Sequence, residues 1–243
     1  MEKKVAKKSE IKVPASKTSL QKNNKKFWLI GGILLVAILA LFLYSSGMPQ
    51  TSTTDKTIQA QGLDKVVAKV NGEDVTQGDV KRVQSILLAQ TGTNIDENQA
   101  IERAINEKLM LTEANNENID VSMEDAENKL VELANQKGVS MEEIKAKSDE
   151  IGSDYNNELE IYREQLVIGE LLKADLPSTE VSTEEAKAYY DSHKETLFKD
   201  GVIRPFDEIE EDLKAALSQQ KFQSTMTSYL GELRADAEIE YLN

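Results

Sequence analysis

The sequence predicts a mainly α-helical fold with a small β-hairpin and a closing strand, preceded by one transmembrane helix. The composition favours helices, because Glu, Lys, Ala, Leu and Gln are abundant while aromatic residues make up only 5%. A helix-start motif recurs along the chain, and one long apolar run stands near the N-terminus. With 243 residues, 40% of them hydrophobic, the chain can bury one moderate core or two lobes.

The charges are divided sharply along the chain. Residues 1–26 carry nine lysines and two glutamates, a balance of +7, whereas the whole chain carries −14, which leaves −21 for the remainder. So acidic a body argues against nucleic acid as the main partner, because phosphate binding needs basic surface on the folded part. The lack of cysteine excludes disulfides, thiol catalysis and thiolate metal sites.

Residues 27–44, "FWLIGGILLVAILALFLY", carry no charge and reach about 27 Å as a helix, enough to span hydrocarbon. Trp28 and Tyr44 stand at its ends, where an aromatic belt lies. Because lysines precede this run, we expect a single-pass anchor in the cell membrane, with a cytoplasmic tail at 1–26 and the acidic body on the periplasmic or extracellular side. A cleaved signal peptide, cut near Ser45 or Gly47, is the alternative.

The segment after this run changes character twice. Residues 45–61 are rich in Ser, Thr and Gln without an apolar period, which predicts a flexible linker before a domain at 62–243. Residues 66–75, "VVAKVNGEDV", predict a β-hairpin that turns at Asn71-Gly72, since Asn-Gly suits a type I′ turn.

The recurring motif marks helix starts. It reads "VTQGDV" at 75–80, "VSMEDA" at 121–126, "VSMEEI" at 139–144 and "VSTEEA" at 181–186. In each copy a hydroxyl residue precedes an acid by three positions, which predicts a capping box, and flanking apolar residues predict a hydrophobic staple. A shared acidic metal site is the weaker interpretation, because nothing in the spacing makes the copies converge.

These signals set the expected helices. We predict them at roughly 76–91, 97–116, 122–137, 140–149, 153–175, 182–198 and 205–235. Asn118 and Gly138 are predicted to end the second and third helices in left-handed conformation, and Pro205 to open the last. Residues 237–242, "AEIEYL", alternate and predict a closing strand beside the hairpin at 66–75.

The last predicted helix has two apolar faces on nearly opposite sides. One is formed by Phe206, Ile209, Leu213, Ala216 and Leu217, and the other by Phe222, Met226, Tyr229 and Leu233. Its halves are therefore expected to bury against different bodies, either two lobes of this chain or one lobe and a homodimer partner.

Several of these segments resemble the N-terminal chaperone domain of the SurA/PrsA family. The most specific are "INEKLMLTEA", "YREQLVIGELL" and "VSTEEAKAYYDSH", and the similarity runs over about 66–243. "PFDEIEEDLKAALSQQKF" and "AEIEYL" resemble the family's returning C-terminal helix and strand. The resemblance implies a helical chaperone domain, which in this family is interrupted by parvulin isomerase domains before the returning helix.

The chain departs from that pattern where the parvulin domain would stand. Only residues 199–204, "KDGVIR", occupy the insertion point, and the chain has one histidine, His193, which falls at a polar helix end. Prolyl isomerase activity is therefore not carried over. We expect no enzyme, no catalytic residue, no metal and no cofactor.

The resemblance, together with the apolar run at 27–44, leads us to expect a membrane-anchored extracytoplasmic chaperone that binds unfolded or nascent secreted and envelope proteins without ATP. An envelope scaffold or assembly protein with one dedicated partner is the alternative, and a hydrolase in the acidic body has little support. Adaptable Met and aromatic side chains suit client binding, although core packing is the competing interpretation for each. The candidates are Phe222, Met226, Tyr229, Phe206, Phe198, Tyr155, Tyr162, Met110 and Met141.

Overall fold

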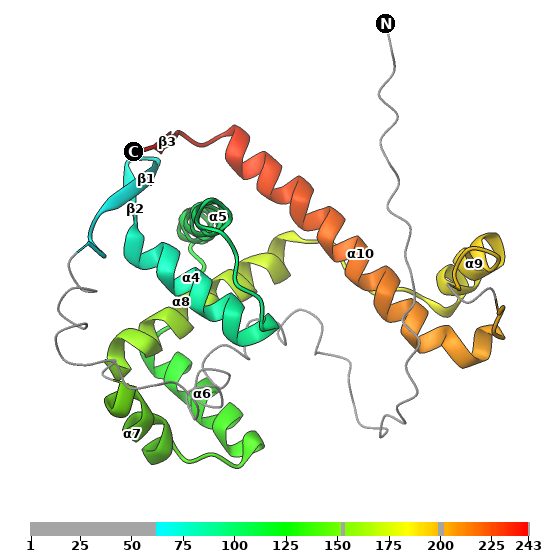
Figure 1. Cartoon of the computed structure of the whole chain (residues 1–243), viewed down its shortest axis with the longest axis horizontal. Helices are drawn as coiled ribbons and strands as arrows, with labels where there is room; N and C mark the ends of the chain where they lie inside the picture. Colours follow the sequence, from blue (N-terminus) through cyan, green and yellow to red (C-terminus); the bar gives the residue numbers. More distant parts are fainter. Residues whose placement is uncertain (1–61, 152–153, 199–201, 243) are drawn as a thin grey trace, which may run out of the picture. The chain divides into compact units, whose positions relative to one another are not determined.

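The computed structural model describes residues 62–151, 154–198 and 202–242, and these residues are mainly helical, as predicted (Figure 1). The predicted tail, transmembrane segment and linker at 1–26, 27–44 and 45–61 lie outside them. None of the helices within the described ranges has the length and apolar character needed to cross a membrane. The elements are β1 Val66–Val70, β2 Glu73–Thr76, α4 Gln77–Thr91, α5 Glu97–Asn116, α6 Met123–Lys137, α7 Met141–Ile151, α8 Tyr155–Asp175, α9 Thr183–His193, α10 Phe206–Ala235 and β3 Ile239–Tyr241.

The predicted hairpin and closing strand form one antiparallel sheet in the order β2-β1-β3. The turn uses Asn71 and Gly72, both with positive φ, as the Asn-Gly pair predicts. β3 pairs with β1, with Val70 opposite Ile239. The closing strand therefore takes the free edge of the hairpin, which is the partner expected from the sequence.

The recurring motif caps helices, as predicted. The N-cap hydroxyl of α4 (Thr76), α7 (Ser140) and α9 (Ser182) accepts a hydrogen bond from the amide three residues later, at 3.2, 3.2 and 3.1 Å. The acid at that position accepts from the N-cap amide in return, at 2.8 to 2.9 Å. At α6 the return bond differs, because Asp125 accepts from the hydroxyl of Ser122 at 2.6 Å. The four acids therefore serve their own helix ends.

Two helix ends use left-handed residues, and one helix is shorter than predicted. Asn118 and Gly138 follow α5 and α6 with φ of 59° and 71°, which confirms the expected stops. The helix predicted over 182–198 ends at His193, and the chain then turns so that Leu197 and Phe198 are both buried. The apolar surface that Leu197 and Phe198 bury in the core of the first unit favours this turn over a longer helix.

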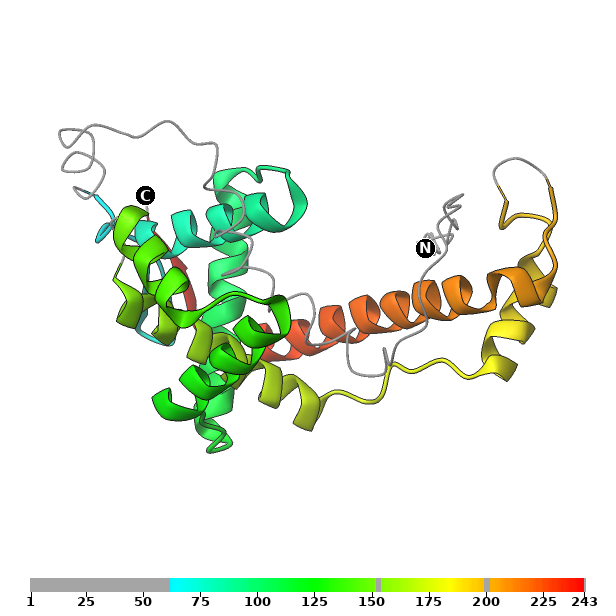
Figure 2. The same ribbon diagram turned by 90° about the horizontal axis from the view of Figure 1, so that it is seen from below.

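The described residues form two compact units, one from 176–228 and the other from 62–175 together with 229–242. In the first unit α9 packs against the N-terminal part of α10 (Figure 2). Its core is formed by Ala186, Tyr190, Leu197, Phe198, Phe206, Ile209 and Leu213.

The second unit has two apolar clusters. One joins the sheet to α4 and α5 around Val70, Val80 and Ile105. The other joins α5, α6 and α8 around Leu130 and Leu171. α10 contributes Phe206, Ile209 and Leu213 to the first unit, and Tyr229 and Leu233 to the clusters of the second. The prediction that its halves bury against different bodies is confirmed, and both bodies belong to this chain.

Candidate functional site

The candidate client-binding residues fall into three groups. Five of them come together at one apolar cluster of the second unit, namely Met110, Met141, Tyr155, Tyr162 and Tyr229. Phe198 and Phe206 belong to the core of the first unit. Phe222 and Met226 are half-buried on α10 and belong to none of the three clusters.

Burial assigns several candidates to core packing in this conformation. Tyr162, Phe198 and Phe206 are only 4%, 7% and 9% exposed. Tyr190 donates its hydroxyl to the carbonyl of Arg204 at 2.7 Å and packs its ring against Phe206, with centroids 5.6 Å apart. These contacts stabilise the first unit and leave little of the candidate rings for a partner.

Tyr229 ties the end of α10 to the end of α8 within the second unit. Its hydroxyl donates to Asp175 Oδ2 at 2.7 Å. Burial and the neighbouring Asp175 carboxylate raise the pKa of the phenol above its ordinary value of 10.0. The hydroxyl therefore keeps its proton and its bond at neutral pH, which gives Tyr229 a structural role beside any contact with a client.

Phe222 and Met226 stand one helical turn apart on the same side of α10. Lys221 beside them is held by Glu185 of α9, at 2.8 Å between Nζ and Oε1. Of the nine candidates, this pair combines partial exposure with a place outside the core clusters. It therefore remains the best-placed apolar contact surface on α10.

The structure adds an apolar feature that sequence reasoning missed. Val202 and Ile203, in the segment before α10, are 60% and 51% exposed. The residue after them is anchored, because the guanidinium of Arg204 lies 5.1 Å from the ring centroid of Phe198. Two branched apolar residues in a short connection with no helical period are the signal that would have identified them.

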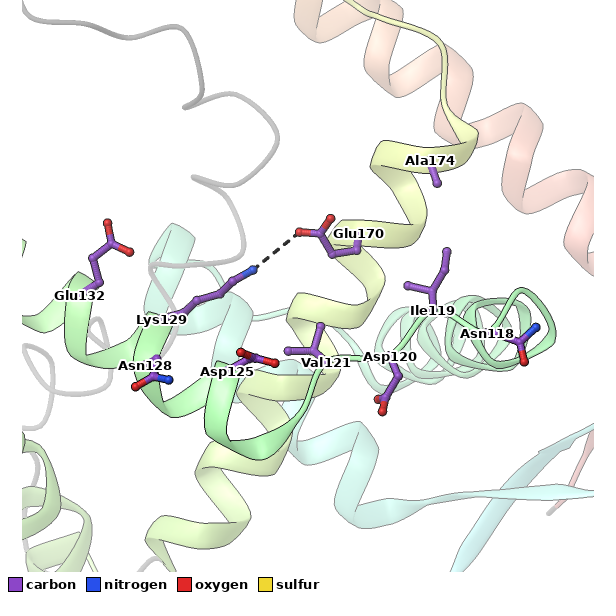
Figure 3. Close-up of a pocket in the computed structure, with 10 residues that line it drawn as sticks. All are labelled: Asn118, Ile119, Asp120, Val121, Asp125, Asn128, Lys129, Glu132, Glu170 and Ala174. Carbon is purple, nitrogen blue, oxygen red and sulfur yellow. Dashed lines mark ion pairs between the residues drawn. The ribbon is translucent and has the colours of Figure 1, made fainter.

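A groove of about 610 Å³ lies in the second unit between α6, α8 and the α5–α6 connection (Figure 3). α6 presents four polar residues spaced along one of its faces. α8 contributes Glu170 and Ala174 one turn apart. The residues that line the groove are Asn118, Ile119, Asp120, Val121, Asp125, Asn128, Lys129, Glu132, Glu170 and Ala174.

The lining is mixed in character and carries a net negative charge, with four carboxylates and one lysine. Lys129 and Glu170 reach toward each other from α6 and α8, with 3.6 Å between Nζ and Oε1 (Figure 3). Asp120 is paired with Arg163 at 2.8 Å. Sequence reasoning missed the groove, because its walls come from segments about 50 residues apart and no local pattern joins them.

A nearly buried polar network joins three helices elsewhere in the second unit. Glu107 of α5 accepts from Arg82 of α4 at 3.0 Å and also from the side-chain amide of Gln165 of α8. Within the described ranges, no group of three or more His, Asp or Glu side chains is arranged to hold a metal ion. The structure therefore offers contact surfaces and a groove as its candidate sites.

The chain was compared with known proteins. Residues 18–138 match the profile of the SurA-like N-terminal domain. No curated protein gives a significant match to the sequence. Among solved structures, one from a study of the virulence factor PEB4 and the periplasmic protein Cj1289 of Campylobacter jejuni, described as structurally related SurA-like chaperones, is similar with a TM-score of 0.53 and 14% identity. That match covers 73% of this chain and 99% of the other and shows a similar fold. The sequence of residues 18–138 is thus similar to the SurA-like N-terminal domain family.

Proposed function

We propose that this protein is a membrane-anchored, extracytoplasmic chaperone that holds unfolded or translocating polypeptides without ATP. The observation that carries the proposal is the SurA-like N-terminal domain at 18–138, together with a fold similar to that of SurA-like chaperones. The clients would be unfolded or nascent secreted and envelope proteins.

Features of the sequence support the anchor and the location. The uncharged run at 27–44 is long enough to span a bilayer, and the lysines before it favour a cytoplasmic N-terminus. The linker at 45–61 would then hold the folded domain near the membrane, which raises its local concentration where clients emerge.

Prolyl isomerase activity is not part of the proposal. Residues 199–204 occupy the place where SurA/PrsA proteins carry a parvulin domain, and they are too few to form one. Holding of clients would therefore depend on surface contacts alone.

The proposed client surface consists of two separate apolar patches of the first unit, the half-buried Phe222 and Met226 of α10 and the exposed Val202 and Ile203 before it. Met adapts its shape to varied partners, and aromatic rings supply a large contact area. Such a surface suits many unrelated apolar segments better than one fixed partner.

The test uses the full-length chain in phosphatidylcholine nanodiscs, with light scattering from two unrelated aggregating proteins as the readout. The wild-type chain is expected to suppress aggregation of both near equimolar ratio, whereas empty nanodiscs do not. Phe222→Ala with Met226→Ala should weaken suppression roughly thirtyfold, since each truncation removes apolar contact worth about 1 kcal/mol, or about 2 kcal/mol together. Gln219→Ala with Gln223→Ala, also one turn apart on α10 and exposed, is the matched control.

The outcomes separate the two candidate functions. If the wild-type chain suppresses neither aggregating protein, the general chaperone function is wrong. A stable one-to-one complex with a single envelope protein, without suppression, would instead support the scaffold.

The topology has its own test, because the chain contains no cysteine and single cysteines label without background. A membrane-impermeant maleimide applied to intact cells, or to spheroplasts if an outer membrane is present, should label Ser178→Cys and spare Ser9→Cys. Equal labelling of both positions, or the reverse pattern, would contradict the proposed orientation.

A further inference from the structure

The groove between α6 and α8 has an apolar floor and an acidic rim. Ile119 and Val121 of the α5–α6 connection and Ala174 of α8 supply the apolar part. Asp125 and Glu132 stand at either end of the face that α6 turns to the groove. Such a pairing of apolar surface with carboxylates matches a side chain that has an aliphatic stem and a positive head.

The negative charge of the groove exceeds what its own neighbours neutralise. Lys129 pairs with Glu170 at 3.6 Å and Arg163 pairs with Asp120 at 2.8 Å. Two carboxylates of the lining, Asp125 and Glu132, form no ion pair with a cationic side chain of the described residues. Asp125 accepts a hydrogen bond from the Ser122 hydroxyl, and Glu132 accepts one from the side-chain amide of Gln136. Both donors are neutral and leave the negative charges in place.

The surface beside the groove is also acidic. Glu117 directly precedes the lining residue Asn118, and Asp175 directly follows Ala174. The pKa of Glu117 lies above its ordinary value because of partial desolvation and then the nearby charges of Asp175 and Glu113. Both Glu117 and Asp175 stand at helix C-termini, where the helix dipole adds further negative potential.

We propose that this groove binds arginine and lysine side chains of an extended polypeptide client. The aliphatic stem would lie over Ile119 and Val121 while the head group contacts either Asp125 or Glu132, which stand two turns apart on α6. Arginine is favoured over lysine, because its planar guanidinium matches carboxylates with two parallel hydrogen bonds. A volume of about 610 Å³ accommodates such a residue together with parts of its neighbours.

This inference rests on the proposed chaperone function and names the client chemistry that its second unit selects. Phe222, Met226, Val202 and Ile203 belong to the first unit, whereas the groove belongs to the second. The two surfaces therefore contribute separately, with apolar contacts on one and basic residues on the other. Clients rich in both kinds of residue are expected to bind best.

The experiment compares two fluorescent decapeptides that differ only in two positions, arginine in one and citrulline in the other. Citrulline keeps the shape of arginine without its charge. Binding to the full-length chain in phosphatidylcholine nanodiscs is measured by fluorescence anisotropy. The arginine peptide should bind roughly tenfold more tightly at low salt, and the difference should shrink at about 0.5 M salt.

Variants locate the effect. Glu132→Gln should reduce the preference for arginine severalfold, because it removes one of the two proposed head-group contacts and leaves the Lys129–Glu170 pair intact. Glu142→Gln makes the same change in charge at an exposed position of the second unit away from the groove and should preserve the preference. Ala174→Leu fills the groove while retaining every charge, and should weaken binding of the arginine peptide severalfold. Circular dichroism checks that each variant keeps its helices.

The outcomes are distinguishable from those of the aggregation test. Equal binding of the two peptides, in a chain that still suppresses aggregation, would overturn the groove inference and leave the proposed function intact. An equal loss of preference in the control variant would overturn it as well, since the effect would then come from net charge. Failure of both peptide binding and aggregation suppression would overturn the proposed function itself.

Discussion

Glu107 lies at the centre of a network whose removal should be costly. Its carboxylate accepts from Arg82 Nη1 at 3.0 Å and from the Gln165 side chain, so one acid joins α4, α5 and α8. The side chains of Glu107 and Arg82 are only 12% and 19% exposed. Burial lowers the pKa of Arg82, but the charges of Glu107 and Asp79 more than compensate, and the guanidinium stays charged.

Glu107→Leu keeps the approximate volume but leaves the Arg82 charge with only the 3.5 Å contact to Asp79. A mostly buried charge that loses its nearest carboxylate costs about 3 kcal/mol, and the Gln165 amide also loses an acceptor. Arg82→Met together with Glu107→Leu removes both charges, so it should cost only about 1 kcal/mol. The double variant is therefore expected to be more stable than the single one.

Hydrogen exchange measured by mass spectrometry on the full-length chain in nanodiscs tests this prediction. A loss of about 3 kcal/mol corresponds to roughly a hundredfold faster exchange of α5 amides through local opening, and the double variant should recover most of that loss. Peptides from α9, in the other unit, serve as the internal control. A change of less than about fivefold in α5, or a double variant as fast as the single one, would refute the reasoning.

Three further predictions follow from hydrogen bonds and charges of the described residues. Tyr229→Phe removes the 2.7 Å bond to Asp175 and should speed exchange at the C-terminal end of α10, by a loss of about 1–2 kcal/mol. Ser182→Ala removes the hydroxyl that caps α9 by accepting a hydrogen bond from the Glu185 amide. It should lower the stability of the first turn of α9 by about 1 kcal/mol in the same assay. The pKa of Glu117 is raised in the folded state, so its contribution to stability is complete below the ordinary value of 4.5 and is lost as pH rises through the folded pKa. Glu117→Gln should therefore raise the melting temperature at neutral pH and make little difference below pH 4.5.

Each of these predictions has a result that would contradict it. Unchanged exchange at the end of α10 in Tyr229→Phe would mean that the bond to Asp175 adds nothing beyond ring packing. If Ser182→Ala destabilises α10 as much as α9, the effect is not one of capping. A Glu117→Gln chain that is less stable than wild type at neutral pH would show that the carboxylate is favourably placed.

The helix starts were predictable because capping is a local interaction. The hydroxyl residue and the acid stand three positions apart, so the four copies of the motif encode both partners of each cap. The hairpin turn at Asn71 and Gly72 is local in the same sense. The predicted end of α9, at residue 198, was wrong by five residues, since the helix ends at His193. The turn that follows depends on the burial of Leu197 and Phe198 in the core of the first unit, which is not a local interaction.

The candidate site was less predictable than the fold. Residue type selected Tyr162, Phe198 and Phe206 as contact residues, but an aromatic side chain serves a core as well as a contact surface, and the structure buries all three. Apolar periodicity correctly separated the two faces of α10. Exposure of Val202 and Ile203 emerged only from the structure, since neither belongs to a periodic segment.

The sequence by itself determined the helical class, the caps, the hairpin, the place of the closing strand and the resemblance to SurA-like proteins. All of these depend on residues close together in the chain or on a pattern along it. Only the tertiary structure decided which apolar residues are buried and which residues line the groove between α6 and α8. The groove joins residues 118–132 to Glu170 and Ala174. Such a surface arises from the packing of helices distant in sequence, which short-range physical chemistry does not encode.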